Sequence, residues 1–420
     1  MNLPDSTDAV RSTDAVRSPQ ASAGTVPDDA SSDLAARPVS GTNHEGPSGP
    51  RRHGRSRLAA GRTPRWTGWG VGAGALVLGA ACSALIGFGI TSWLIFSAVI
   101  YVVAMYALTW AVENRRKATN GLWTNLIVGA FLVALIPLIS VLWTVISNGW
   151  AGITAPGFFA SDMVGITGAQ DQATASGSQP LLGGIKHALI GTLMITLAAS
   201  LISVPIGLLA SIYLVEYSND NLFAKVLRFF VDVMTGIPSI VAGLFATGLM
   251  MVLTQTVFGL PPGSNIMGFS AAIGLSVLMI PVVVRSTEEM LRVVPNELRE
   301  ASSALGVRKW RTVMKVVLPT ALSGIASGVT LAIARVVGET APILVTAGVA
   351  LSTNWNLVQN WMMTLPVYIY RQLMNPTAPA APGPSEERAW GAALTLIIIV
   401  MVLNLLARLI ARAFAPKQGR

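Results

Sequence analysis

Cysteine and histidine are almost absent from the 420-residue sequence, which contains one cysteine and three histidines. The single cysteine, Cys82, lies inside an apolar run, so no disulfide framework and no thiolate metal site can form within the chain. His44, His53 and His187 stand far apart in the sequence and form no cluster of imidazole ligands. We therefore expect neither a metal site nor a catalytic residue in this chain.

Charged residues are also scarce. They make up 12% of the chain, against 52% hydrophobic residues, and the mean hydropathy is +0.59. This composition is too apolar for an ordinary soluble surface, and a hydrocarbon core of about 30 Å needs roughly 20 apolar helical residues to cross it. Eight segments meet that criterion: Trp69–Ile90, Trp93–Val112, Thr124–Ile146, Leu189–Leu214, Ile240–Phe258, Met267–Val284, Ala321–Ala347 and Ala392–Ile410. The predicted fold class is all-α, a polytopic membrane protein with about eight transmembrane helices, of which the first two could instead form one re-entrant pair.

The net charge of +9 is concentrated at the chain ends and in every second connection between predicted spans. The basic residues concerned are Arg51, Arg52, Arg55, Arg57, Arg62, Arg65, Arg115, Arg116, Lys117, Lys225, Arg228, Arg308, Lys309, Arg311, Lys315, Arg412, Lys417 and Arg420. The alternate connections Ser147–Gly184 and Leu260–Ile266 have no Lys or Arg, and Ser352–Trp390 has only two. The positive-inside rule then predicts that both termini and the basic connections are cytoplasmic. This distribution gives no support to nucleic-acid binding.

Residues 1–66 contain no long apolar run and are rich in Ser, Asp, Pro, Gly and Arg. They include a tandem STDAVR repeat at Ser6–Arg11 and Ser12–Arg17. Such a segment cannot bury enough apolar area to offset its ordering entropy, so we expect a disordered cytoplasmic tail. The apolar run begins too late for a cleavable signal peptide. After this tail we expect N-terminal transmembrane spans over residues 67–147. They comprise accessory spans and the first span that flanks the core.

One basic connection contains a compact amphipathic unit, REASSALGVRKWRTVMKVVLP, from Arg299 to Pro319. Pro295 and Asn296 predict a helix start with Asn as its cap, and Gly306 predicts that helix's end in a left-handed conformation. A second helix would follow, and Pro319 would open the next span. Each helix of about 10 residues is roughly 15 Å long and cannot cross the bilayer. An amphipathic loop resting on anionic headgroups explains this pattern as well as a docking unit does.

The same unit resembles the EAA signature of ABC-transporter permeases. The resemblance rests on Glu300-Ala301-Ser302, Gly306 and Val316-Val317-Leu318-Pro319. In that family this loop, residues 286–319 here, forms a coupling helix that docks into a groove of the cytoplasmic ATPase. The resemblance therefore implies that Glu300, Ala301, Gly306, Leu318 and Pro319 couple the chain to an ATPase. Ser302 replaces the second alanine of the signature, a small-for-small change that we expect to be compatible with docking.

Five further stretches resemble the phosphate permeases of this family. They are GIKHALIGTLMITL (184–197), VPIGLLASIYLVEY (204–217), GIPSIVAGLF (236–245), VVVRSTEEMLRVVP (282–295) and IARVVGETAPILVTAG (333–348). The resemblance implies a type I ABC permease domain over residues 184–415. The Gly-Glu-Thr-Ala-Pro and Tyr-Leu-Val-Glu-Tyr forms are more similar to PstA-type than to PstC-type subunits. Two additional spans before Thr124 exceed the usual six-helix pattern.

Two charges lie within the seventh predicted span. Arg335 and Glu339 are spaced i, i+4, about 24 Å of helix beyond Pro319. A charge at such depth costs at least about 2.5–3.5 kcal/mol and usually faces an interior or a wet cavity. We expect Arg335 to offer its planar fork to phosphate oxygens, with Glu339 as its counter-ion and Thr340 beside them in the substrate path. The alternative is a structural pair that is neutralised on one helix face.

Proline and glycine pairs predict two places where the backbone bends. Gly338 and Pro342 predict a local break in the seventh span, which exposes backbone polar groups to a lined cavity. Gly236 and Pro238 predict a hinge between a cytoplasmic amphipathic helix, Leu222–Val233, and the fifth span. A simple proline kink is the alternative for this second pair.

The energy for transport has to come from another chain. None of the six lysines lies in a G-x-x-x-x-G-K-[ST] context, so we expect no cofactor and no enzyme activity here, with ATP and Mg²⁺ bound by a partner ATPase. The resemblance implies a permease subunit of an ATP-driven phosphate importer in a prokaryotic cytoplasmic membrane. It also implies, besides phosphate and membrane lipid, a PstC-like permease, a PstB-like ATPase dimer and an external PstS-like phosphate-binding protein as partners. An ABC permease for sulfate or molybdate and a membrane protein of another class, an intramembrane enzyme or receptor, remain alternatives.

Overall fold

The computed structural model describes residue 64 and residues 66–218 and 221–413, and these residues form helices and loops without a strand. The predicted disordered tail lies outside the described residues, apart from Pro64 and Trp66. The helices are α1 (Thr67–Ile86), α2 (Ile90–Val112), α3 (Arg115–Thr154), α4 (Gly168–Ala175), α5 (Lys186–Ile212), α6 (Leu222–Thr235), α7 (Ser239–Met251), α8 (Gly268–Val293), α9 (Asn296–Ala304), α10 (Lys309–Thr312), α11 (Leu318–Val337), α12 (Ala341–Thr346), α13 (Leu365–Met374) and α14 (Gly383–Ala413). Three π-helical turns, η1 (Tyr213–Tyr217), η2 (Val252–Val257) and η3 (Val313–Val317), continue α5, α7 and α10.

Eight helices in the described part of the chain are long and apolar enough to cross a membrane, which confirms the prediction of an all-α, multi-pass membrane protein. The first two are separate helices of 20 and 23 residues rather than a re-entrant pair. The third is longer than predicted, because α3 runs for 40 residues, roughly 60 Å at 1.5 Å per residue. The last helix begins at Gly383 rather than near Ala392, so Arg388 lies in a helix and not in a loop.

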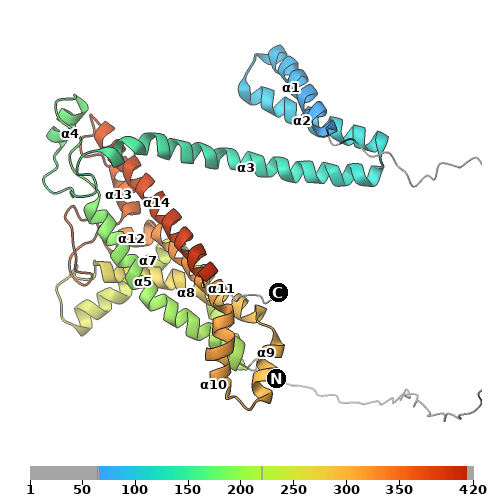
Figure 1. Ribbon diagram of the computed structural model, residues 1–420. Helices are drawn as coiled ribbons and strands as arrows, with labels where there is room; N and C mark the ends of the chain where they lie inside the picture. The colour runs from blue at the N-terminus through green and yellow to red at the C-terminus, as the bar shows by residue number, and fades with distance from the viewer. Residues whose placement is uncertain (1–63, 65, 219–220, 414–420) are drawn as a thin grey trace, which may run out of the picture.

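The helices form a bundle with short helices at its two ends. Figure 1 shows α4 and α13 at one end of the bundle and α9 and α10 at the other. The α1–α2 hairpin lies beside α3, apart from the bundle, and α3 in turn packs against α14. We call the end with α9 and α10 the basic face, because Arg308, Lys309, Arg311 and Lys315 lie there. The opposite end, with α4 and α13, is called the far face.

Helix α8 is the central span. Of its most apolar 18-residue window 61% is buried, against 28% or less for the other spans. Its first three turns bury mostly small residues, namely Gly268, Ser270, Ala271, Ala272, Gly274 and Ser276. Small side chains let helix backbones approach closely, and close packing drives helix association where lipid removes the hydrophobic difference. The composition of α8 therefore explains why α5, α7 and α11 can all pack around it.

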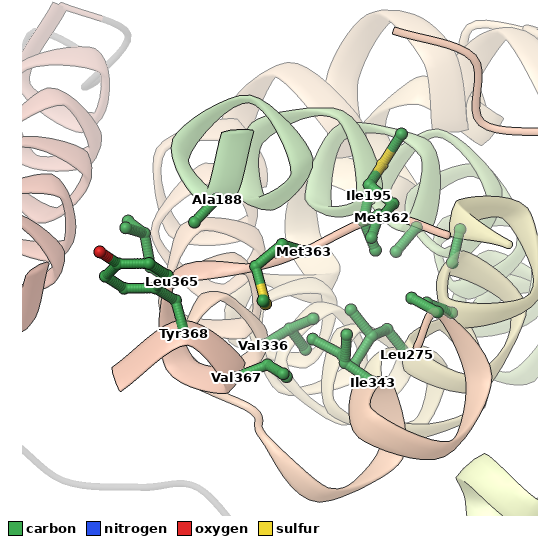
Figure 2. Packing of buried hydrophobic residues seen from close by; sticks show 14 of the residues in the cluster. Ala188, Ile195, Leu275, Val336, Ile343, Met362, Met363, Leu365, Val367 and Tyr368 are labelled. Atoms are coloured by element: carbon green, nitrogen blue, oxygen red, sulfur yellow. The ribbon is translucent and has the colours of Figure 1, made fainter. Parts of the chain in front are cut away.

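The largest buried cluster lies toward the far face and combines several elements that are distant in sequence (Figure 2). It includes Ala188 and Ile195 of α5, Leu275 of α8, Val336 of α11, Ile343 of α12, Met362 and Met363 just before α13, and Leu365, Val367 and Tyr368 in the first turn of α13. This cluster holds the end of α11 and the short helix α12 in one place. It therefore positions the interruption between these two helices.

Polar groups fasten the loops of the far face. The carboxylate of Asp162 accepts hydrogen bonds from the backbone N–H of Val164 and from both the N–H and the hydroxyl of Thr353. Burial raises the pKa of Asp162, but these three hydrogen bonds and the charge of His187 together lower it by more, so the net pKa is below its ordinary value. Two loops separated by 191 residues are thereby joined by one carboxylate.

A buried ion pair attaches α4 to α14. The Arg388 guanidinium donates to both carboxylate oxygens of Asp171, at 3.0 and 2.5 Å, and also to the carbonyl of Leu182 and the hydroxyl of Ser385. The side chains of Arg388 and Asp171 are 0% and 1% exposed. Such a bidentate pair fixes the relative orientation of the two side chains. Each buried charge needs the other to offset the cost of its removal from water.

Removing one partner of this pair should be costly. We expect Arg388→Met to leave the Asp171 carboxylate buried without its counter-charge, at a cost of about 3–5 kcal/mol. Asp171→Leu combined with Arg388→Met should recover most of the stability, because no lone charge remains. Thermal unfolding of the detergent-purified protein measures both. Arg285→Met, which breaks the exposed Arg285–Asp232 pair, is the control and should change little. A single Arg388→Met variant as stable as that control would contradict the role of the pair.

Candidate functional site

Residues 296–312 on the basic face, which we call the coupling segment after the role predicted for it, form a helix–turn–helix closed by one glycine. Helix α9 ends at Ala304, and Gly306 has a φ of +71°, the left-handed conformation predicted for it. The N–H of Val307 donates to the carbonyl of Ser302, and the N–H of Gly306 donates to the carbonyl of Ser303. These bonds satisfy carbonyl groups at the end of α9 that have no partner within the helix.

Ser302, the one departure from the signature, has a structural role. Its hydroxyl lies 2.7 Å from the hydroxyl of Thr312, and both residues are buried. The bond joins α9 to the last residue of α10, so it closes the base of the turn. The interpretation of Ser302 as only a small-for-small change is therefore incomplete, because an alanine could not make this bond.

The start of α9 and the end of the unit differ from their predictions. The cap of α9 is Pro295, and Asn296 is the first helical residue, whose side-chain oxygen accepts from Arg299 instead of capping the helix. Pro319 does not open a separate span. Residues Lys309–Val337 form one continuous run through α10, η3 and α11, and Pro319 is the second residue of α11, directly after the π-helical turn η3.

The predicted coupling residues divide by exposure. Glu300, Ala301 and Gly306 are exposed on the basic face, and Pro319 is exposed near the start of α11. Leu318 is half-buried and packs against the cluster formed by residues such as Leu291 and Val317. Exposed residues are available to a partner, whereas Leu318 serves the internal packing of the loop.

The seventh span is interrupted where Gly338 and Pro342 predict a break. Helix α11 ends at Val337, and α12 begins at Ala341 with Pro342 in its first turn. In a continuous helix residue 342 would donate its N–H to the carbonyl of Gly338, but proline has no N–H. The break is thus confirmed, and its role as a hinge stays a prediction.

The break separates two charges that were expected on one helix face. Arg335 is exposed in the last turn of α11, where a cation suits the helix dipole. Glu339 lies beyond the helix end and is half-buried, as is Thr340, the cap of α12. Among the described residues no ion pair joins Arg335 to Glu339. The predicted i, i+4 pair is therefore wrong in its geometry, because the helix ends before Glu339.

Helix α7 holds the short helix α12 by direct backbone contact. A Cβ at Gly243 would lie 2.6 Å from the Cα of Pro342 and 2.9 Å from Cγ2 of Val345, so only glycine fits there. The hydroxyl of Thr247 donates to the carbonyl of Val345 at 3.3 Å. Sequence analysis missed Gly243, although its place among the small residues of a predicted span was a signal for a close helix contact.

The second predicted bend lies at the other end of α7. Helix α6 ends at Thr235, Gly236 follows as its cap, and Pro238 precedes the first residue of α7. The amphipathic helix predicted here is confirmed as α6. Helix α7 thus starts at the Gly236–Pro238 bend and packs against α12, the helix that follows the break at residues 338–340. The structure connects the two bends, while their function as hinges stays a prediction.

Comparison with known proteins identifies the family. A family model described as "Binding-protein-dependent transport system inner membrane component" matches residues 203–420. The phosphate transport system permease protein PstA 1 of Mycobacterium tuberculosis (strain ATCC 25618 / H37Rv) is 44% identical over 306 residues, which are 73% of this chain and 91% of that protein. PstA of Haemophilus influenzae is 35% identical over 294 residues, 70% of this chain and 94% of that protein. An inward-facing structure of the MetNI methionine ABC transporter is similar with a TM-score of 0.42 at 21% identity, covering 54% of this chain and 93% of that chain.

The matched region includes the coupling segment and both bends. The family model covers more than half of the sequence, and the two relatives are matched over nearly their whole length. The chain therefore belongs to the binding-protein-dependent transport system inner membrane components, and within them to the PstA family of permease proteins.

Proposed function

We propose that this chain is a permease subunit of an ATP-driven importer of inorganic phosphate and forms half of its transmembrane pathway. The observation that carries this proposal is the 44% identity to a phosphate transport system permease protein, matched over 91% of that relative. The importer would lie in the cytoplasmic membrane of a prokaryotic cell. A PstC-like permease would form the other half of the pathway, and an external PstS-like protein would deliver phosphate.

The basic face would bind a PstB-like ATPase dimer. Glu300, Ala301 and Gly306 are exposed there on a turn held by the Ser302–Thr312 hydrogen bond. A rigid, exposed helix–turn–helix can transfer movement from one protein to another without losing it in a flexible loop. ATP and Mg²⁺ would be bound by the ATPase, and this chain would receive only the movement.

Arg335 would contact phosphate in the pathway. It is exposed at the end of α11, and among the described residues it has no ion-pair partner. A lone charge in a membrane-spanning segment costs at least about 2.5–3.5 kcal/mol unless it faces water or an anion. The planar guanidinium matches phosphate oxygens, so a wet path between two permeases satisfies both the charge and the substrate. Glu339, which lies apart from Arg335 beyond the helix end, would repel a second anion, with Thr340 beside it.

Disturbing the turn should uncouple the chain from its ATPase. Gly306→Val places a β-branched residue in a left-handed conformation, at a strain of about 1–3 kcal/mol. We expect normal membrane insertion but reduced ATPase association or reduced transport-linked ATP hydrolysis. Gly259→Val is the matched control, because Gly259 has a φ of +66° and open space around it outside the coupling segment. Normal uptake by a well-expressed Gly306→Val variant would rule out the proposed docking role.

Labelling of single cysteines tests the orientation. With Cys82 replaced by Ala, a cysteine at Ser176 on the far face should react with a membrane-impermeant thiol reagent in intact cells. A cysteine at Ser303 on the basic face should react only after permeabilisation, because the positive-inside rule places that face in the cytoplasm. Both positions are exposed on the protein surface, so a difference in labelling reports the side of the membrane and not burial of the cysteine. The reverse labelling pattern would overturn the orientation and the docking proposal with it.

Substitution of Arg335 tests the pathway. Arg335→Gln removes the charge and the fork, and the loss of a charged hydrogen bond to phosphate enclosed in the pathway, about 2–5 kcal/mol, should lower phosphate uptake by at least about thirtyfold. Arg335→Lys should recover part of it, since ammonium keeps the charge without the bidentate geometry. Arg371→Gln, a change of an exposed arginine in the last turn of α13, is the control.

The measurement is radiolabelled phosphate uptake per assembled complex in a strain without its own importer, with excess unlabelled sulfate as a competitor. Because Arg335 and Glu339 are not paired, Arg335→Gln combined with Glu339→Gln should be as inactive as Arg335→Gln alone. Substantial uptake by either variant would remove Arg335 from the substrate path. Inhibition by sulfate as strong as that by phosphate would contradict the assignment of the substrate.

A further inference from the structure

Arg299 lies next to the exposed Glu300 but faces the body of the protein. Successive residues of an α-helix are about 100° apart, so α9 has one face for a partner and another for its own chain. The guanidinium of Arg299 makes five hydrogen bonds, as many as it has N–H donors. Nε and Nη2 donate to Oε1 of Glu216, at 3.1 and 2.8 Å. Nη2 also donates to the carbonyl of Leu291 at 2.9 Å, and Nη1 donates to the carbonyl of Val294 at 2.6 Å and to Oδ1 of Asn296 at 3.2 Å.

Four of these bonds connect α9 to two other helices. Glu216 belongs to η1, the continuation of α5. Leu291 is in the last turn of α8, and Val294 is the residue that caps α8. The last carbonyls of a helix lack their usual partners within it. Arg299 donates to two of them, and the carbonyl of Leu291 also accepts from the N–H of Val294. One side chain of α9 thus holds the basic ends of α5 and α8 together.

The π-helical turn η1 brings Glu216 to this position. The N–H of Ser218 donates to the carbonyl of Tyr213, a bond from residue i+5 to residue i. Such a turn holds one residue more than an α-helical turn, so it changes the direction in which the following side chains point. The next residue, Tyr217, lies under the ammonium of Lys309 in α10, 5.3 Å from the ring centroid. Two adjacent residues of η1 therefore contact α9 and α10, the two halves of the coupling segment.

Apolar packing does not replace these contacts. Among the described residues, α9 contributes no side chain to a buried apolar cluster, and Ser302 is its only buried residue. A cavity of about 590 Å³ lies between η1, the end of α8 and the α9–α10 turn. The Glu216 side chain is 6% exposed and that of Arg299 is 21% exposed, so both are largely buried where they line this cavity. It is the main link of α9 to α5 and α8.

We propose that Arg299 and Glu216 form a clamp that transmits movement of the coupling segment to α5 and α8 at the same time. This proposal rests on the proposed function, because it assigns the internal half of the coupling for which Glu300 and Gly306 supply the external half. Arg299 is a positioning residue: it touches neither substrate nor ATPase, and it makes α9 move as one body with two spans. The central span α8 and its neighbour α5 then respond together to the ATPase.

The proposal is tested on the complete transporter, reconstituted in proteoliposomes with its ATPase and its phosphate-binding protein. Arg299→Lys keeps the charge but cannot make the five bonds, and Glu216→Gln removes the charge of its partner. We expect both variants to retain the ATPase in wild-type amount and to hydrolyse ATP at the basal rate. The phosphate transported per ATP should fall about tenfold, within the 5–150-fold range that is typical of coupling between sites.

The control variant is Arg292→Gln. It breaks the Arg292–Glu288 pair in the last turns of α8, which has a 2.5 Å contact. Arg292 lines the same cavity as Arg299, but its side chain is 60% exposed. This pair joins residues of one helix only, so the transport ratio should remain at the wild-type value. A wild-type ratio in both Arg299→Lys and Glu216→Gln would overturn the clamp. If both variants fail to bind the ATPase, the pair only shapes the docking face, and the clamp is equally wrong.

A second measurement does not depend on phosphate. Hydrogen exchange of residues 213–217 and 288–294 should change when the wild-type complex binds ATP, and Arg299→Lys should lose this change while the exchange within α9 still responds. Equal responses in the variant and the wild type would contradict the clamp. Absence of phosphate uptake by the wild-type complex would instead contradict the proposed function and leave the exchange result to decide the clamp.

Discussion

Every backbone N–H and C=O within a membrane must find a partner inside the protein, and this constraint organises the whole chain. It makes the spans helical and makes each helix end a problem that side chains or neighbouring segments must solve. At residues 338–340 the end of α11 is placed against the buried cluster of the far face. At the basic face the last carbonyls of α8 are satisfied by a side chain from α9. The irregular segments of this protein are therefore the places where its parts are connected.

Close approach between helices is the second common feature. In lipid, apolar side chains gain little by leaving their surroundings, so small residues and van der Waals contact decide which helices associate. Helix α8 is central because its buried residues are small, and α7 reaches α12 because Gly243 has no side chain. Polar contacts then add register: Asp171 binds Arg388 over 217 residues, and Glu216 binds Arg299 over 83. Packing sets which elements meet, and the ion pairs determine how they are aligned.

Sequence analysis predicted what depends on local pattern. Eight apolar runs, the glycine turn at 306 and the break near Pro342 follow from hydropathy and backbone chemistry, and the structure confirms them. The pairing of Arg335 with Glu339 was wrong, because helical spacing was extended across a residue where the helix ends. Contacts such as Glu216–Arg299 and Gly243–Pro342 join residues far apart in the chain and leave no local periodicity. The exposed part of the coupling segment was therefore predictable, and its internal attachment was not.

The hydroxyl pair of Ser302 and Thr312 has a consequence for how this segment can evolve. Each hydroxyl is buried and has the other as its partner, so its value depends on the residue at the second position. Losing one of them leaves a buried polar group without that bond, whereas replacing both by apolar groups of similar shape is nearly neutral. The two positions are thus epistatic. Whether a mutation at one position lowers or raises the stability of the turn depends on which residue stands at the other. The exposed α9–α10 turn is in this way tied to a pair of buried residues that lie beneath it.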